Sequence, residues 1–194
     1  MTLLSFDKDH DDAAQELANA APELAQAEFG LELVTDDPAQ LRAAFSRFPS
    51  GIAALCATVD DAPAGMVATS FSVGVSFDPP LVMFSVQNSS TTWPRLRTAP
   101  QIGVSILGRE HAKLASQLAS RNGDRFAGVD TLTTPSRAIL IRESAIWMEC
   151  EILSETPAGD HHIVVLEVKS IRVEHDVEPL IYHASKFRHL SEAV

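Results

Sequence analysis

The chain has 194 residues, of which 45% are hydrophobic and 21% are charged, and this composition suits one globular domain with at most an appendage. Its formal net charge of −11 argues against a basic nucleic-acid-binding face, and no apolar run approaches the roughly 18 residues of a membrane helix. The first ten residues lack the basic start and apolar stretch of a secretory signal, so we expect a cytoplasmic protein that binds neither nucleic acid nor membrane.

The acidic residues are concentrated at the N-terminal end. Residues 1–40 hold ten acids and one base, a charge of −9, whereas the rest of the chain holds 16 acids and 14 bases, a charge of −2. We therefore expect residues 1–37 to form an acidic extension, either disordered in part or carrying one or two weak helices over Asp11–Phe29. A role in docking a partner is the alternative.

The main domain is expected over residues 38–194, and it begins with a helix. In Asp37-Pro38 a capping residue precedes a proline at the first helical position, and apolar residues then recur at helical spacing. These signals predict an amphipathic helix over Pro38–Arg47.

After this helix the apolar period becomes that of β-strands. Short β-forming runs are separated by clusters of Asp, Pro, Gly and Ser, and the main helical pattern among them is Arg109–Ser120, with Leu114 and Leu118 inward. Because most strands follow one another without a helix, we expect a mainly β fold: an antiparallel barrel, closed or split, with flanking helices. The predicted strands are Ile52–Val59, Gly65–Phe71, Leu81–Gln87, Gln101–Leu107, Ser144–Glu155, His162–Glu174 and Leu180–His183, the last followed by a solvated tail.

Familiar catalytic motifs are absent from the sequence. There is no Gly-rich dinucleotide fingerprint after a strand, no phosphate-binding GxxxxGK[ST], no HExxH and no GxSxG. Cys56 and Cys150 lie in separate predicted strands with no Cys/His cluster at metal spacing. We expect no metal site and two buried reduced thiols, a disulfide being the alternative.

A run of hydroxyl side chains lies where a strand gives way to a helical stretch. The residues Ser89–Thr92 precede Pro94–Thr98. Hydroxyls and the free N–H groups of a helix start can bind an anion, to which Arg95 or Arg97 would add charge. The same residues are also typical of a plain helix cap, which is the alternative.

Three further segments have residue types suited to a ligand. Gly65–Phe71 is a strand of small and apolar residues that would let a flat ligand reach the backbone, or simply a packed strand. Gly159–His162 places a turn and two histidines at a strand start, and at most one of them faces a site, because neighbouring residues point to opposite faces. In the loop Asn122–Gly128, Phe126 either covers a ligand ring or anchors the loop.

Taken in order, these segments resemble the flavin reductase-like family, which has a split-barrel flavin-binding fold. The resemblance covers about Pro38 to Leu190. It is carried by FPSG (Phe48–Gly51), GMVATSF (Gly65–Phe71), FDPPLVMFSV (Phe77–Val86), SSTTW (Ser89–Trp93), GDRFAGV (Gly123–Val129), GDHH (Gly159–His162) and the closing YHASKFR (Tyr182–Arg188).

The resemblance implies a binding site for FMN or FAD beside a site for NADH or NADPH. Gly159-Asp160-His161 is similar to the family's nicotinamide-associated motif, and His161 is the candidate for the face where hydride donor and flavin meet. Thr69 stands where the family often has asparagine, so a side-chain amide contact is expected to be missing. The candidate flavin contacts are Met66, Val67, Ala68, Thr69 and Ser70 (ring and ribityl chain), Ser85, Val86 and Gln87 (beside the ring), Ser90, Thr91 and Thr92 (phosphate), Gln117 and Leu118 (distal part) and Phe126.

The leading hypothesis is an NAD(P)H:flavin oxidoreductase, a homodimer as the resemblance implies, that supplies reduced flavin to a separate monooxygenase. The alternatives are a flavoprotein that keeps its FMN and passes electrons on, and a non-enzymatic flavin- or haem-binding barrel. The cofactor carries the difficult step of such a reaction, so the protein needs only to hold two flat rings together and exclude water. This fits a chain without catalytic motifs.

Overall fold

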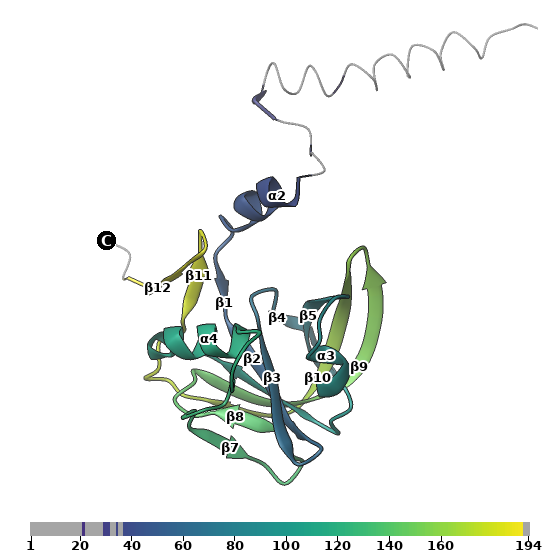
Figure 1. The fold of residues 1–194 in the computed structure, drawn as a ribbon, viewed down its shortest axis with the longest axis vertical. Coiled ribbons are helices and arrows are strands. Elements are labelled where there is room, and N and C mark those ends of the chain that lie inside the picture. Colours follow the sequence, from purple (N-terminus) through teal and green to yellow (C-terminus); the bar gives the residue numbers. More distant parts are fainter. Residues whose placement is uncertain (1–20, 22–28, 32–33, 35–36, 192–194) are drawn as a thin grey trace, which may run out of the picture. The chain divides into compact units, whose positions relative to one another are not determined.

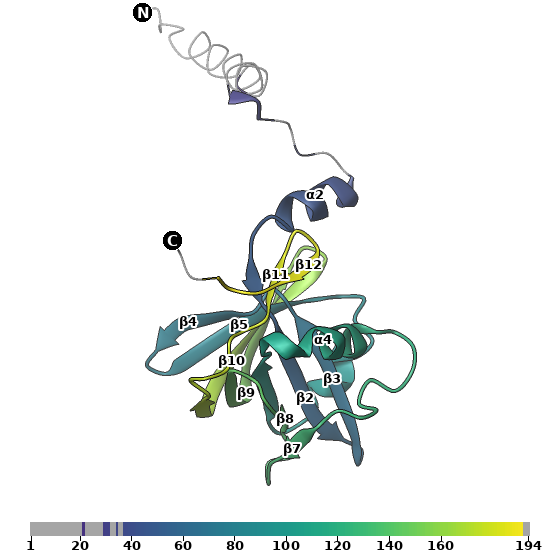
Figure 2. The same ribbon diagram turned by 90° about the vertical axis from the view of Figure 1, so that its left-hand side faces the viewer.

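Seven strands form one antiparallel sheet in the order β3-β2-β6-β9-β10-β5-β4, and Figures 1 and 2 show that it is strongly curved. β3 and β4 follow one another in the chain yet form the two edges of the sheet, joined by the segment 69–71. The barrel is therefore split between β3 and β4, and the predicted split-barrel fold is confirmed. The strands are β2 (Ala53–Val59), β3 (Ala62–Ala68), β4 (Ser72–Phe77), β5 (Pro80–Gln87), β6 (Ile102–Ile106), β9 (Ile146–Ala158) and β10 (His161–Val173).

Shorter elements surround this sheet. The predicted helix Arg109–Ser120 is a 3-10 turn, Arg109–His111, followed by α4 (Ala112–Ala119), and Leu118 is fully buried as expected. The remaining elements are the sheet of β1 (Ser50–Gly51), β11 (Ile181–His183) and β12 (Lys186–Arg188), the pair β7 (Thr131–Thr133) and β8 (Ile139–Ile141), and the helix α3 (Trp93–Leu96).

Five strands were not predicted, and the first of them, β1, has only two residues, directly before the predicted strand Ile52–Val59. β4 alternates small or polar residues with the apolar Val73, Val75 and Phe77, but Gly74 at its centre weakens the strand signal, and its pairing with β5 has a register shift between Ser72 and Ser76. β7, β8 and β12 have three residues each, too few to show a period. β12, expected as a solvated tail, instead pairs with β11.

The computed structural model describes residues 21, 29–31, 34 and 37–191, and the chain divides into two compact units, Met1–Phe45 and Ser46–Val194. The helices expected over Asp11–Phe29 lie outside the described residues except for Ala21 and Phe29. In the described part no helix is long and apolar enough to cross a membrane. The expected cytoplasmic location stays a prediction.

The predicted helix at Pro38 is present as α2 (Pro38–Phe45) but ends before Arg47. The Asp37 carboxylate accepts a hydrogen bond from the Ala39 N–H at 2.9 Å, so the expected cap is in place. None of the helix residues is buried, and Phe45 is 71% exposed. The expected amphipathic face therefore buries no side chain among the described residues.

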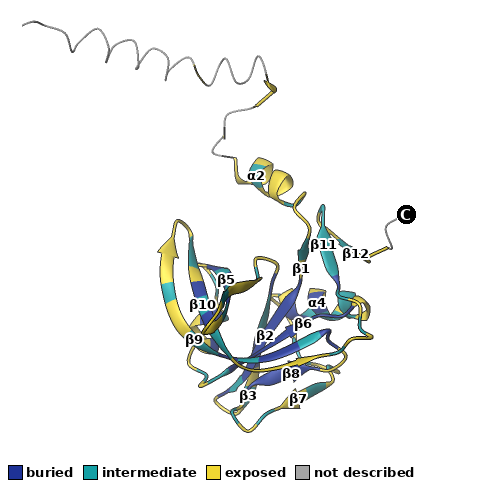
Figure 3. Ribbon diagram, turned by 180° about the vertical axis from the view of Figure 1, so that it is seen from behind, coloured by how far each residue is buried: buried dark blue, intermediate teal, exposed yellow. Residues whose placement is uncertain are grey.

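The central strand β2 lies between two hydrophobic clusters. Leu55 and its alternate neighbours pack with β5, β6, β9 and β10, whereas Ala54 and Cys56 pack on the other side with Leu118 of α4. Figure 3 shows β2 as a buried strand. Because both faces of β2 are covered, it is a rigid base from which the hairpin to β3 extends toward the split.

One close backbone approach and two buried thiols characterise this core. A Cβ on Gly103 of β6 would lie 2.2 Å from the Ile139 carbonyl oxygen of β8, so only glycine allows β8 to approach. Cys56 and Cys150 are buried and free, as predicted, and burial raises the pKa of both thiols to about 12. Both are therefore protonated and inert at neutral pH.

Candidate functional site

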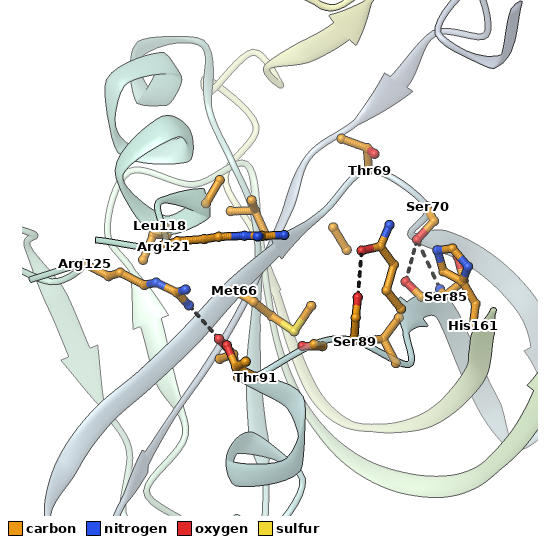
Figure 4. Close-up of a pocket in the computed structure, with 17 residues that line it drawn as sticks. Met66, Thr69, Ser70, Ser85, Ser89, Thr91, Leu118, Arg121, Arg125 and His161 are labelled. Carbon is orange, nitrogen blue, oxygen red and sulfur yellow. Dashed lines mark hydrogen bonds between the residues drawn. The ribbon is translucent and has the colours of Figure 1, made fainter. Parts of the chain in front are cut away.

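A cavity of about 720 Å³ opens where the barrel is split, between the ends of β3 and β5, the hydroxyl loop Ser89–Thr92 and α4 (Figure 4). The structure brings together most of the predicted flavin contacts there. Its lining residues are Met66, Val67, Ala68, Thr69, Ser70, Ser85, Val86, Gln87, Ser89, Ser90, Thr91, Thr92, Leu118, Ala119, Arg121, Arg125 and His161.

Hydrogen bonds from Ser70 connect the two sides of the split. Ladder pairing of β3 ends at Ala68, and the Ser70 hydroxyl then bonds to the β5 backbone, donating to the Ser85 carbonyl at 3.0 Å and accepting from its N–H at 3.1 Å. Ser70 therefore holds β5 in place of a strand partner. The small residues of this segment leave the floor of the cavity open.

The hydroxyl loop lines the cavity, and two of its hydroxyls bond within the protein. The Ser90 hydroxyl accepts a hydrogen bond from the Trp93 N–H at 3.1 Å just before α3, whose N-cap Thr92 makes no side-chain cap bond, and the Thr92 hydroxyl accepts one from Arg125 at 2.7 Å. α3 has only four residues, so it adds little dipole for an anion. Thr91 lies beside the cavity, as Figure 4 shows.

Arg95 and Arg97, the expected sources of charge for this loop, do not supply it to this cavity. Arg95 donates to the Val59 carbonyl at 2.9 Å, because the α3 helix packs over the β2–β3 turn, and Arg97 pairs with Glu155 at 3.2 Å. Neither arginine lines the cavity.

The cavity instead receives positive charge from Arg121 and Arg125, which the sequence reasoning missed. Arg125 is half-buried and donates to the carbonyls of Ser120 and Gly65, at 2.6 and 3.0 Å. Arg121 extends across the cavity in Figure 4, and it has no side-chain hydrogen bond or ion pair with any described residue. No carboxylate is among the described lining residues, so this arginine end of the cavity, Arg121 and Arg125, favours an anion in an acidic protein.

The opposite end of the cavity, the histidine end, is lined by His161, whose ring Asp160 supports from outside the lining. The His161 Nδ1 lies 2.6 Å from an Asp160 carboxylate oxygen, and the ring borders the cavity near Ser70 and Ser85 (Figure 4). Gly159 adopts a φ of +62°, which makes the tight turn between β9 and β10. In the part of the chain that the structure describes, no group of three or more His, Cys, Asp or Glu side chains could hold a metal ion.

Asn88 holds the turn of the histidine end in place. Its N–H donates to the Asp160 carbonyl at 2.9 Å, and its side-chain oxygen lies 2.7 Å from the His162 Nδ1. His162 thus pairs with Asn88 and does not line the cavity, while His161 does. The expectation that at most one histidine faces the site agrees with this placement.

Four candidate contacts lie outside the cavity lining. Gly159 and Asp160 shape the turn beside His161, while the Gln117 side chain donates to the Arg125 and Ala127 carbonyls and so holds the loop after α4. Phe126 borders an adjoining cavity instead. Four lining residues were in turn absent from the candidate list: Ser89, Ala119, Arg121 and Arg125.

The chain matches known proteins over the described barrel. The model of the flavin reductase like domain matches residues 45–191. A flavin reductase of Pseudomonas putida is 32% identical over 148 residues, covering 76% of this chain and 86% of the relative. The reductase subunit HsaB of a flavin-dependent monooxygenase from Rhodococcus jostii is 26% identical and covers 78% of this chain and 77% of the subunit.

A solved structure shares the fold and a third of the sequence. The Streptomyces globisporus NADH:FAD oxidoreductase SgcE6, in complex with NAD and FAD fragments, has 32% identity and a TM-score of 0.77, covering 83% of this chain and 98% of that one. With a family match over three quarters of its length and relatives that span the same barrel, this chain belongs to the flavin reductase-like family.

Proposed function

We propose that this protein is an NAD(P)H:flavin oxidoreductase that transfers hydride to FMN or FAD and supplies the reduced flavin to a separate monooxygenase. The observation that carries this proposal is the cavity at the split, which has at one end an arginine with no partner among the described residues and at the other a carboxylate-supported histidine. The NADH:FAD oxidoreductase and the monooxygenase reductase subunit among the relatives support it.

The residues present fit a flavin. Ligand cavities have volumes of roughly 300–1,000 Å³, and this one, of about 720 Å³, lies within that range. Its small and apolar residues at Val67 and Ala68 leave space for a flat ring, and the Arg121 guanidinium, which pairs with no residue in the described part of the chain, suits a phosphate. When bound, the flavin supplies the acceptor for the hydride of the nicotinamide.

The two ends of the cavity have separate tasks in this proposal. Arg121, Arg125 and the hydroxyl of Thr91 bind the flavin phosphate, which orients the ring toward Thr69 and Ser70. The Asp160 carboxylate holds His161 at the rim, where it contacts the nicotinamide nucleotide and limits the approach of water. No protein acid or base is required, because orientation of the two rings supplies the main rate enhancement.

We also propose that the protein is a homodimer. β4 is an edge strand, and its apolar side chains Val73, Val75 and Phe77 are 64%, 43% and 88% exposed. An exposed edge with apolar residues favours association with a second chain. Sedimentation equilibrium tests this: Phe77→Ser should shift the protein toward monomer, and a monomeric wild type would contradict the proposal.

Steady-state oxidation of NADH and NADPH with and without added flavin tests the function. We expect a colourless purified protein whose nicotinamide oxidation depends on added FMN or FAD. A protein that purifies yellow and retains its flavin would contradict exchange with a monooxygenase. Absence of oxidation with either flavin and either nicotinamide would contradict the proposed function itself.

A further inference from the structure

A second cavity, of about 460 Å³, adjoins the first at its arginine end. The two cavities share Thr91, Thr92 and Arg125 in their linings. The second one extends from this junction over the start of β3, Ala62–Gly65, and under Phe126 in the loop after α4. A ligand that fills the first cavity as far as Arg125 can therefore continue into the second.

We propose that the second cavity binds the adenosine diphosphate half of FAD, so that this protein prefers FAD to FMN. The inference rests on the proposed function and assigns a role to Phe126. FMN ends at the phosphate that the arginine end would hold, whereas FAD continues from that phosphate through a second one to adenosine. The junction of the two cavities therefore lies where a bound FMN would end and a bound FAD would continue.

The junction has donors for a second phosphate. Arg125 uses Nε for the Ser120 carbonyl and one terminal nitrogen for the Gly65 carbonyl and the Thr92 hydroxyl. The other terminal nitrogen has no hydrogen-bond partner among the described residues. A half-buried guanidinium that is fixed in place and has free donors suits a pyrophosphate.

The second cavity is suited to a purine ring. Its floor is the small, apolar start of β3, and the tip of the Phe126 ring packs so closely on Gly65 that a Cβ there would lie 2.7 Å from Phe126 Cζ. The ring is half-buried and borders the cavity, so it can stack on a base. The charges also agree: Arg95 and Arg125 line the cavity against one carboxylate, Asp124, which accepts a hydrogen bond from the Phe126 N–H at 2.9 Å.

NADH contains the same adenosine diphosphate half, but the geometry favours FAD. His161, where the nicotinamide is proposed to lie, is at the opposite end of the first cavity from Arg125 (Figure 4). A nicotinamide dinucleotide would reach the second cavity only by crossing the whole flavin site. A flavin held with its phosphate at Arg125 reaches it directly.

Steady-state kinetics of Phe126→Leu test the inference, with FAD, FMN and NADH each varied in turn. Loss of a base-stacking ring should raise the ratio of the FAD KM to the FMN KM by about tenfold, with no change in the NADH KM. Phe187→Leu is the matched control, because Phe187 packs on the same hydrophobic cluster as Phe126 but lines neither cavity. This control should leave all three KM values unchanged.

If Phe126→Leu lowers the Tm, its kinetics are harder to interpret, so Ala62→Phe gives a second test. The new ring would fill the second cavity from β3. It should raise the FAD KM selectively. Equal KM values of the wild type for FAD and FMN would overturn the inference but leave the proposed flavin reduction intact. A rise of the NADH KM alone in Phe126→Leu or Ala62→Phe would also overturn it, and would assign the second cavity to the nicotinamide nucleotide. Absence of turnover with both flavins would refute the proposed function and this inference together.

Discussion

The two ends of the first cavity are built in different ways. At the arginine end, charge is brought by long side chains of a loop, and Arg121 has no partner among the described residues. At the histidine end, a short turn is fixed by hydrogen bonds among Asn88, Asp160, His161 and His162. At the arginine end, hydrogen-bond donors stay available to a ligand. At the histidine end, the hydrogen bonds are used within the protein and fix the position of the His161 ring. We therefore expect substitutions at the arginine end to change flavin affinity, and substitutions at the histidine end to change the KM for the nicotinamide nucleotide.

The largest expected effect comes from Arg125→Ala. This change removes the guanidinium shared by both cavities together with its bonds to Ser120, Gly65 and Thr92. We expect the KM for FAD to rise about 30-fold and the Tm to fall by roughly 5 °C. Kinetics and thermal unfolding measure the two effects. An unchanged flavin KM would show that the arginine end does not bind the cofactor.

Arg121→Ala should separate flavin binding from stability. Because Arg121 has no intramolecular partner among the described residues, its removal should raise the flavin KM about tenfold and leave the Tm unchanged. Arg121→Lys, which keeps the charge, should recover part of the affinity. A fall in Tm equal to that of Arg125→Ala would contradict the difference between the two arginines.

His161→Ala tests the histidine end. The ring is held by Asp160 at 2.6 Å and borders the cavity far from the arginines. We expect the KM for the nicotinamide nucleotide to rise about fivefold, with flavin affinity unchanged. Equal losses for both ligands would remove the assigned role of His161 and the separation of the two ends.

Asn88→Ala should give the smallest change, in the same direction as His161→Ala. The side chain bonds to His162 and to the Gly159 carbonyl but lines neither cavity. We expect a rise of about twofold in the nicotinamide KM. Asn88→Asp keeps an acceptor for His162 and should restore most of the wild-type value, whereas an identical loss in both variants would show that Asn88 does not position the turn.

Much of the fold followed from the sequence because the main strands have clear periods. β2, β5 and β6 lie within one residue of their predicted limits, whereas β4 was missed although Val73, Val75 and Phe77 alternate, because glycine at its centre is typical of a turn. The predicted strand Gly65–Phe71 is displaced toward the C-terminus relative to β3, since pairing with β2 begins at Ala62 and ends at Ala68. The residues past Ala68 form the edge of the cavity.

The site was predictable where its residues are consecutive in the chain. Met66–Ser70 and Ser90–Thr92 line the cavity as whole segments, whereas Arg121 and Arg125 reach it from a loop that is distant in sequence. Arg95, nearer to the hydroxyl loop, is bound instead to the β2–β3 turn. The spacing of residues along the sequence could not show which arginine side chains reach the cavity, because hydrogen bonds to distant segments decide where each side chain lies.

A crystal structure of the protein with FAD would show where the flavin binds. We expect the flavin ring beside Thr69 and Ser70, with the flavin phosphate within hydrogen-bond distance of Arg121 or Arg125. Flavin bound elsewhere on the protein, or a cavity that stays empty at saturating FAD, would contradict this expectation.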